Sequence, residues 1–427
     1  MDLNFTEEVM YTLPFYLGPL FILATINFLR KQKNYRLNDT LTNATIALGN
    51  LGLSFIFLLA VVALYTLVYN EYRLFELDQS NPLIYVLAFF VYDFLYYWNH
   101  RFHHMIGLFW ADHLVHHTAE NFNFGVSIRI SYFTELTMWM TFIPMAFMGI
   151  SLEVFLAASY TQIIWAFCIH TKYLKKTPRA DKIFNTPSLH RVHHARNRQY
   201  IDKNYGGILI IWDRLFGTYQ RELEDDPVVY GVRESYPSFS PLVINSYYLK
   251  TIWQKIKCSS SVFEVFCSVF APPAWLPKNA NKADFYSLSA KVRSKDFKPK
   301  DPFICKRTKW TAFVRFSAIV VVFTYLMSYF GELPTLPQVS MSLLFFWLCH
   351  FNGLVFDGAK VGLHMEAVTQ LLYGLILYWA ITTEQAAWVT LGTATLALIS
   401  LCNYMIYRTR TVEPVALAAE PQHQTTT

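Results

Sequence analysis

Long apolar runs alternate with short polar segments along the 427 residues of the chain. A helix of about 20 mostly apolar residues spans the roughly 30 Å hydrocarbon core of a bilayer, so each such run is a candidate membrane span. The candidates are residues 11–29, 47–68, 82–98, 313–330, 340–356, 367–381 and 386–407. Residues 138–158 and 156–169 run nearly together, and their joint length favours a re-entering hairpin or two tilted helices. The pattern predicts an all-α, polytopic membrane protein with about eight or nine transmembrane or re-entrant helices.

Composition and charge agree with a membrane protein. Hydrophobic residues make up 54% of the chain and charged residues only 15%, whereas soluble domains carry about 25% charged residues. Lys and Arg gather after the first apolar run and at residues 172–179, 291–300 and 408–410, which the positive-inside rule places in the cytosol. The net charge of +6 therefore reflects topology. The chain contains no basic module with interleaved aromatic residues, so we do not expect a nucleic-acid partner.

The same patterns divide the chain into regions. We expect an N-terminal membrane anchor at 1–44, a catalytic domain at 45–235, a linker region at 236–311, C-terminal transmembrane helices at 312–411 and a disordered tail at 412–427. Within the linker region, Phe239–Val269 mixes aromatic, apolar and basic residues. This mixture predicts amphipathic helices that lie along the membrane surface. The six cysteines show no C-x-x-C spacing and are expected to be reduced packing thiols.

Nine of the thirteen histidines form three groups with the spacing H-x-x-H-H. Positions i, i+3 and i+4 share one helix face, so each triplet is expected to aim its imidazoles at one point. Imidazole is a good ligand for iron, zinc or copper, and eight or more nitrogen ligands exceed what one ion accepts. The triplets therefore predict two metal ions on the cytosolic side; the alternative is ordinary hydrogen-bonded histidines. They are His100, His103 and His104; His113, His116 and His117; and His190, His193 and His194.

Four further residues are candidates for the same centre. His170, at the end of the predicted hairpin, either supplies another ligand or is structural. Asp93 lies two helical turns before His100 within an apolar run, where a buried carboxylate needs a partner such as an imidazole N–H or a tyrosine. Glu120 and Asp202 follow the second and third triplets, so each is expected to accept a hydrogen bond from a histidine or to bind metal directly.

Other polar features have more than one reading. Asp112 lies off the triplet face and is expected to be a cap or a solvated charge. Four arginines interleave with the triplets, and they either hold a lipid phosphate or glycerol headgroup or simply anchor the cytosolic edge. They are Arg101, Arg191, Arg196 and Arg198. No G-x-G-x-x-G and no H-P-G-G stretch is present, so redox chemistry would draw electrons from a separate reductant.

The histidine spacing resembles that of the fatty acid hydroxylase and sterol desaturase superfamily. The H-x-x-x-H of His100 and His104 and the two later H-x-x-H-H groups look like its three histidine boxes, in which His103 would be an extra residue. The stretch "NTPSLHRVHHARNRQYIDKNYGGILIIWDRLFGTYQRE" at 185–222, with "FWADHLVHHTAENFNFGVSIR" and "CIHTK", is most similar to the alkylglycerol monooxygenase branch. The resemblance covers roughly residues 45–235.

This resemblance implies a membrane-bound di-iron lipid oxidase that uses O2. The eight box histidines and His170 would bind two Fe ions, and tetrahydrobiopterin would be the electron donor. The reaction would cleave the ether bond of an alkylglycerol to glycerol and a fatty aldehyde. Alternatives with the same chemistry are fatty-acyl, sterol or carotenoid hydroxylases and desaturases. A metal transporter or a haem electron carrier is a more remote alternative, because neither requires three triplets at one membrane edge.

Overall fold

The computed structural model describes residues 35–232, 238–282, 285, 306–329, 333–357, 363–383 and 387–408. All regular elements in this part of the chain are helices, as the hydrophobic pattern predicts, and it contains no strand apart from two isolated bridges, Phe184 with Leu209 and Ala195 with Tyr230. The predicted N-terminal run at 11–29 and the C-terminal tail lie outside the described residues.

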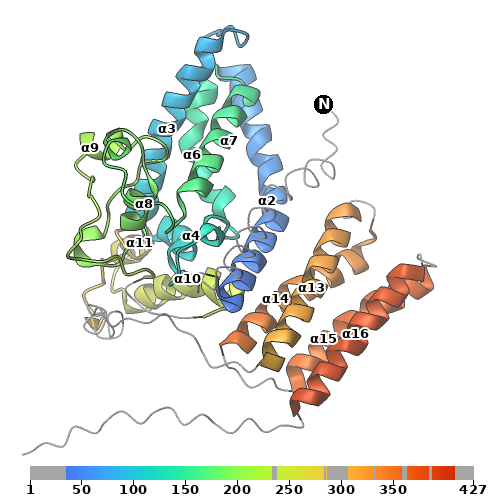
Figure 1. Ribbon diagram of the computed structural model, residues 1–427. Helices are drawn as coiled ribbons and strands as arrows, with labels where there is room; N and C mark the ends of the chain where they lie inside the picture. Colours follow the sequence, from blue (N-terminus) through green and yellow to red (C-terminus); the bar gives the residue numbers. More distant parts are fainter. Residues whose placement is uncertain are drawn as a thin grey trace, which may run out of the picture.

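Four long helices pack side by side and form the upper part of the molecule in Figure 1. They are α2 (Leu37–Tyr72), α3 (Pro82–Met105), α6 (Thr134–Phe147) and α7 (Leu152–Ile169). The start of α3 has strong local signals, because the Asn81 side chain accepts a hydrogen bond from the Leu83 N–H and Pro82 occupies the first turn. Tyr92, Phe142 and Met145 are buried between the helices. The core of this four-helix unit fixes where α3 and α7 end.

The joint apolar stretch at 138–169 forms two helices connected by a tight turn instead of one continuous span, which fits both predicted arrangements. Gly149 makes the turn with a φ of 79°, and a Cβ at this position would lie 2.0 Å from the Phe75 carbonyl oxygen. Only glycine fits such a left-handed, closely packed position. The hydroxyl of Tyr65 on α2 donates to the Ile150 carbonyl at 3.0 Å and ties the turn to the four-helix unit.

Short helices cover the lower end of this unit. Two of them carry histidines, α4 (Gly107–His117) and α8 (Pro187–His193), and they are accompanied by α5 (Phe124–Ser127), α9 (Ile211–Leu215) and the 3-10 turns Ala180–Lys182 and Arg198–Tyr200. The predicted amphipathic stretch forms α10 (Pro241–Cys258) and α11 (Val262–Phe270), both of which pack against α4.

The C-terminal part is a second bundle of four helices, drawn in orange and red in Figure 1. They are α13 (Lys306–Tyr329), α14 (Thr335–Phe356), α15 (Leu363–Thr382) and α16 (Ala387–Arg408), close to the four predicted runs. Leu48 of α2 joins the core formed by Phe323, Leu344 and Phe345. The second bundle therefore packs directly against the first.

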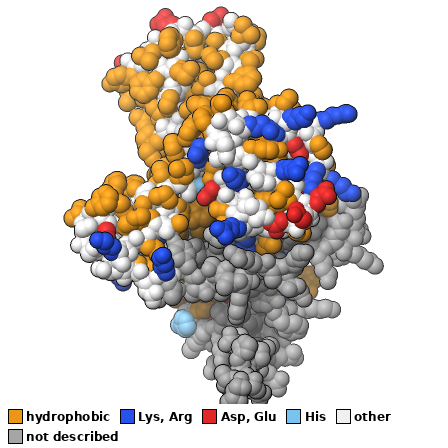
Figure 2. Space-filling model, turned by 90° about the vertical axis from the view of Figure 1, so that its left-hand side faces the viewer, with side chains coloured by type: hydrophobic (Ala, Val, Ile, Leu, Met, Phe, Trp, Pro, Cys, Tyr) orange, Lys and Arg blue, Asp and Glu red, His pale blue; other side chains and the backbone are white. Residues whose placement is uncertain are grey.

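Three of the described helices are long and apolar enough to cross a membrane: α7, α14 and α15. A fourth is added if α2, which bends by 49°, counts as one span. The expected total of eight or nine stays a prediction. Large hydrophobic side chains are exposed over the end of the four-helix unit remote from the histidines, whereas Lys and Arg gather over the loop-rich end (Figure 2). This division suits a helix bundle that enters a membrane with its histidine end outside the hydrocarbon.

Candidate metal centre

Histidines from four elements meet at the lower end of the four-helix unit. His100 and His104 come from the last turns of α3, and His113, His116 and His117 from α4. His170 caps the C-terminal end of α7, while His190 and His193 lie on α8 and His194 caps it. Pro187 in the first turn of α8 helps to fix the start of that helix.

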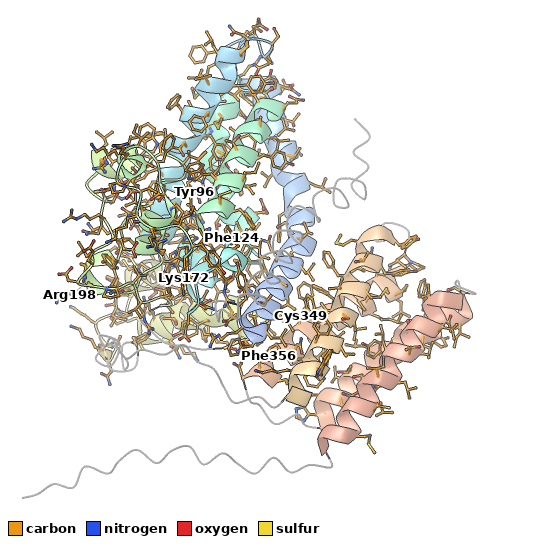
Figure 3. All side chains as sticks on the ribbon, viewed as in Figure 1. Tyr96, Phe124, Lys172, Arg198, Cys349 and Phe356 are labelled. Atoms are coloured by element: carbon orange, nitrogen blue, oxygen red, sulfur yellow. The ribbon has the colours of Figure 1, made fainter. Side chains whose placement is uncertain are left out.

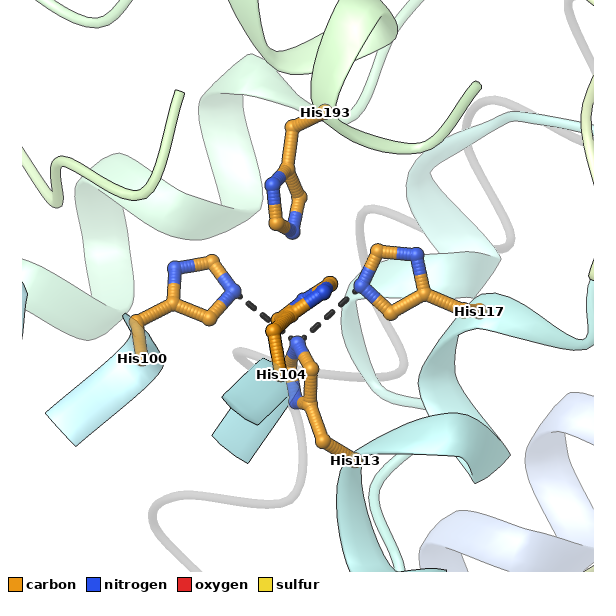
Figure 4. Close-up of side chains that lie close together, drawn as sticks. All are labelled: His100, His104, His113, His117 and His193. Atoms are coloured by element: carbon orange, nitrogen blue, oxygen red, sulfur yellow. Dashed lines mark hydrogen bonds between the residues drawn. The ribbon is translucent and has the colours of Figure 1, made fainter. Parts of the chain in front are cut away.

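The nine imidazoles form two groups of candidate metal ligands. Within each group, one nitrogen per residue lies within 4.8 Å of every other. Figure 4 shows the five-histidine group, in which the rings converge from α3, α4 and α8. The five-histidine group is His100, His104, His113, His117 and His193. The four-histidine group is His116, His170, His190 and His194.

The division between the groups corrects the expectation that each triplet points at one place. Residues four apart on a helix are only about 40° apart around its axis, whereas a residue three positions on lies about 60° to the other side. His113 and His117 accordingly face one group, while His116 faces the other. In the third triplet, His190 and His194 share the four-histidine group and His193 crosses to the five-histidine group.

His103 belongs to neither group. Its ring is 3% exposed, with Nδ1 2.8 Å from the Asn99 carbonyl oxygen and Nε2 3.0 Å from the Thr137 hydroxyl. Asp112, expected to be a cap or a solvated charge, is buried instead and accepts hydrogen bonds from the hydroxyls of Thr134 and Thr137. The first triplet thus contributes a pair of candidate ligands, and its middle residue joins a buried polar network.

The protonation of the rings can be tested against the requirements of a metal site. Nδ1 of His116 lies 3.3 Å from the Arg129 carbonyl oxygen, and Nδ1 of His170 faces the Ala166 carbonyl. A carbonyl only accepts, so each Nδ1 carries the hydrogen and each Nε2 presents a lone pair. These two Nε2 atoms nevertheless lie 3.1 Å apart. Two acceptors at this distance repel each other unless a cation lies between them.

The five-histidine group also brings ring nitrogens close together. His100 Nδ1 faces the Tyr205 carbonyl oxygen at 2.9 Å, and its Nε2 lies 2.9 Å from Nε2 of His113. Nε2 atoms of His104 and His193 are buried and have no hydrogen-bond partner. Neighbouring ligand atoms around a metal with bonds of about 2.1 Å lie roughly 3 Å apart. The residues present therefore fit two metal ions, and imidazole donors suit Fe, Zn, Cu and Ni.

Burial keeps these imidazoles neutral. It lowers the pKa of His193 to about 3 and that of His170 to about 4, against the unfolded value of 6.5. For the other seven, burial and then the neighbouring imidazoles hold the pKa well below its usual range. Because only neutral imidazole binds metal, the centre is in its ligand form at neutral pH.

The three predicted acids lie in different places. Asp93 accepts from the Ile208 N–H at 2.7 Å and the Trp212 indole at 2.8 Å instead of from an imidazole. Asp202 comes closest, with an oxygen 3.6 Å from Nδ1 of His104. Glu120 belongs to neither histidine group and lines a polar cavity of about 30 Å³ together with Arg129. The expected partners of Asp93, an imidazole N–H or a tyrosine, are not among the hydrogen bonds that the structure gives for this carboxylate.

The arginines also differ in their burial and in their partners. Arg191 is buried, forms an ion pair with Glu222 at 2.8 Å and donates to the Thr171 and Leu174 carbonyls. Arg196 is buried as well and donates to the Val232 carbonyl. Arg198 is exposed and points away from the molecule in Figure 3. Of these three, only Arg198 remains accessible for a headgroup.

Sequence reasoning missed the backbone carbonyls of Lys203 and Tyr205, which face Nδ1 of His193 and His100 at 2.9 Å. It also missed Asp213, whose carboxylate accepts hydrogen bonds from two backbone N–H groups of the same loop. A carbonyl has no signature in a sequence. The available signal was Asp213 itself, which with Arg214 interrupts an otherwise apolar stretch.

Comparison with known proteins supports the same segment of the chain. Residues 85–218 match the fatty acid hydroxylase family. The alkylglycerol monooxygenase of Homo sapiens is 34% identical over 272 residues, which cover 64% of this chain and 60% of that protein. The alkylglycerol monooxygenase of Xenopus tropicalis is 35% identical over 258 residues, 60% of this chain and 57% of the relative. The resemblance inferred from the histidine spacing is confirmed.

A third relative acts on a different lipid. An ornithine lipid hydroxylase from Rhizobium tropici is 32% identical over 174 residues, which cover 40% of this chain and 51% of that protein. The chain thus matches between 51% and 60% of the length of these relatives. No solved structure matches it.

Proposed function

Because residues 85–218 match the fatty acid hydroxylase family, we propose that this protein is an integral membrane, O2-dependent lipid monooxygenase. Its nine grouped histidines bind two Fe ions, and its substrate is an alkylglycerol. The single observation that carries the metal assignment is the pair of lone-pair nitrogens on His116 and His170, 3.1 Å apart. The alkylglycerol monooxygenases among the relatives support the substrate class.

The chain's own residues prepare the centre for such chemistry. The imidazoles hold the metals as neutral donors, and carbonyl groups fix the rings of His100, His193 and His116. Phe122, 1% exposed, packs against His170 with ring centroids 5.4 Å apart and keeps water from that side of the four-histidine group. When bound, the two irons supply the redox chemistry of O2 activation, which no amino-acid side chain provides.

The proposed reaction inserts one oxygen atom of O2 into the C–H bond next to the ether oxygen of the alkylglycerol. The other oxygen atom leaves as water, and a reductant supplies two electrons and two protons. The product is a hemiacetal, which expels glycerol and leaves a fatty aldehyde. Tetrahydrobiopterin is the proposed reductant. In this proposal the histidine end faces the cytosol at the edge of the membrane. The alkyl chain of the substrate lies in the membrane, and its polar glycerol end reaches the metals.

A second candidate is hydroxylation of another polar lipid. It keeps the oxygen insertion and the metal site but ends at a stable alcohol, because the carbon attacked carries no ether oxygen. The similarity to an ornithine lipid hydroxylase favours this alternative over desaturation.

The test is metal content and lipid turnover of purified protein supplied with Fe²⁺, O2 and reduced tetrahydrobiopterin. We expect two irons per chain and O2-dependent release of a long-chain aldehyde from an alkylglycerol. His116→Ala should abolish aldehyde release, whereas His364→Ala, which changes an exposed histidine on α15, should not. Two irons without aldehyde would direct the search to other lipids. Active protein without bound metal would refute the proposal.

A further inference from the structure

The two histidine groups are supported by different parts of the chain. In the five-histidine group, Nδ1 of His193 faces the Lys203 carbonyl and Nδ1 of His100 faces the Tyr205 carbonyl, both at 2.9 Å. Nδ1 of His104 lies 3.6 Å from an Asp202 oxygen. Three of the five rings therefore face one four-residue stretch, Asp202–Tyr205.

The four-histidine group has other supports. Nδ1 of His116 faces the Arg129 carbonyl, and Nδ1 of His170 faces Ala166 in its own helix. The Arg129 guanidinium is held separately, through Asn43 and Thr118. None of the contacts that the structure gives for these rings involves Asp202–Tyr205.

The stretch has an uncommon backbone. Asp202 and Asn204 adopt φ angles of 57° and 58°, in the left-handed region that Asp and Asn tolerate better than most residues. Asn204, 0% exposed, donates to the Leu189 and Gln220 carbonyls at 3.0 and 2.7 Å and accepts from the Gln220 N–H at 2.8 Å. Its side chain thus fixes the middle of the stretch to α8, which carries His193 and also His190 of the four-histidine group.

A buried carboxylate fixes the other end. The two oxygens of Asp213, also 0% exposed, accept from the Tyr205 and Gly206 N–H groups at 2.8 and 2.7 Å and from the Thr218 hydroxyl at 2.6 Å. Hydrogen bonds to a charged acceptor are about twice as strong as neutral ones. They hold the peptide whose carbonyl receives the His100 N–H.

We propose that Asp202–Gly206 is a positioning loop for the five-histidine site alone, and that Asn204 and Asp213 are the positioning residues that hold it. This inference rests on the proposed function only in requiring that both groups bind metal. Groups behind the ligands fix ring orientation and tautomer, and losing one typically costs 10–100-fold in metal affinity. The two metals can thus be perturbed one at a time.

The test is titration of the metal-free, full-length protein with Co²⁺ alone, read by the visible absorption of bound cobalt and by metal analysis. Wild-type protein should bind two Co²⁺. His100→Ala and His190→Ala identify the signal of each site. Asp213→Asn turns one accepting oxygen into an NH2 group that faces backbone donors. Asn204→Gly removes the side-chain bonds and keeps a residue that tolerates a positive φ.

In both variants we expect binding at the five-histidine site to weaken 10–100-fold while the four-histidine site keeps its affinity, which also shows that the protein is folded. Asp225→Asn, a matched change of an exposed acid, should alter neither site. Equal weakening of both sites, loss of both, or no change in either variant would overturn the proposal. Selective weakening in a protein that leaves alkylglycerols untouched would support the positioning loop while refuting the substrate assignment. A wild-type protein that binds no Co²⁺ would refute both.

Discussion

At the scale of single residues, the histidine centre concentrates neutral imidazoles where protonation is unfavourable. Burial lowers the pKa of His170 to about 4 and that of His193 to about 3. In the unfolded chain each histidine takes up a proton below about pH 6.5, but in the fold it does not. The unfolded state therefore binds more protons between pH 6.5 and 4, and lowering the pH through this range favours unfolding.

The direction of this pH dependence gives a prediction for the stability of the metal-free protein. Its thermal unfolding midpoint in detergent should be constant from pH 8 to 7 and should fall from pH 6.5 to 5.5. One pH unit below the unfolded pKa, each such imidazole contributes a loss of up to about 1.4 kcal/mol. Protein loaded with metal should have a higher midpoint and show the same fall, because the folded imidazoles are neutral with or without metal whereas those of the unfolded chain still take up protons. A midpoint that rises on acidification would contradict the burial of these rings.

A second prediction separates His103 from its neighbour His104. The His103 ring is occupied by Asn99 and Thr137, so His103→Gln should retain two metals and lower the free energy of unfolding by about 1–3 kcal/mol. His104→Gln, the same substitution one position on, should lose metal from the five-histidine site. Metal analysis and thermal unfolding of the two variants decide, and metal loss in His103→Gln would make it a ligand.

Residue spacing was enough to find the candidate ligands but not their grouping. The spacing i, i+3, i+4 identifies residues on one side of a helix, and all eight box histidines and His170 lie in the two groups. Which side each ring faces depends on where α4 and α8 lie between the two groups, a tertiary fact that a single helix does not encode. The same reason explains Asp93, whose partners at 208–212 are more than 100 residues away.

At the scale of elements, the apolar pattern predicted most helices because burial and membrane contact both require long apolar faces. The ends of the helices were harder to predict from the sequence. The predicted run at 82–98 continues as helix to Met105, because His100 and His104 pack against α4 and against His193 of α8 instead of facing solvent. Short helices such as α8 and α9 left no periodic signal of their own.

The amphipathic α11 leads to a third prediction. Val262, Phe263 and Phe266 are 86, 72 and 58% exposed, whereas Ser268 is buried against Ser259. An apolar helix face of this kind suits the interface between headgroups and acyl chains. In liposomes, a spin label at Phe263→Cys in a background without other cysteines should be more accessible to O2 than to a water-soluble nickel chelate. A label at the exposed Glu224 should show the reverse. Equal accessibility at both positions would contradict interfacial contact.

At the scale of the whole molecule, the C-terminal bundle is joined to the half that carries the histidine groups through the end of α14. Asp357 accepts from the Ser238 hydroxyl and the Phe239 N–H, and Ser240 lies 2.6 Å from Nδ1 of His350. Ser240 also caps α10, which packs against α4, the helix that carries three of the histidines. His350 thus belongs to a connection between the two halves.

Glycine at position 353 makes this close approach possible, because a Cβ there would lie 2.2 Å from the Ser240 Cα and 2.4 Å from the Phe239 carbonyl oxygen. Gly353→Ala should therefore destabilise the protein by about 2 kcal/mol or more, since backbone must move to admit the methyl group. Gly374→Ala is the matched control. No atom lies within 4 Å of its added Cβ, so it should be neutral or stabilising by up to about 1 kcal/mol. Thermal unfolding measures both.

The activity of the same two variants then tests what the C-terminal bundle contributes. Gly353→Ala leaves every histidine in place, so at a temperature where it remains folded it should still bind two metals. If its aldehyde release falls while metal content and Gly374→Ala activity stay at wild-type level, the contact at Ser240 transmits the position of α14 through α10 to the histidines of α4. Unchanged activity in a destabilised Gly353→Ala would instead restrict the bundle to anchoring and stability, because the metal centre would work without the close contact.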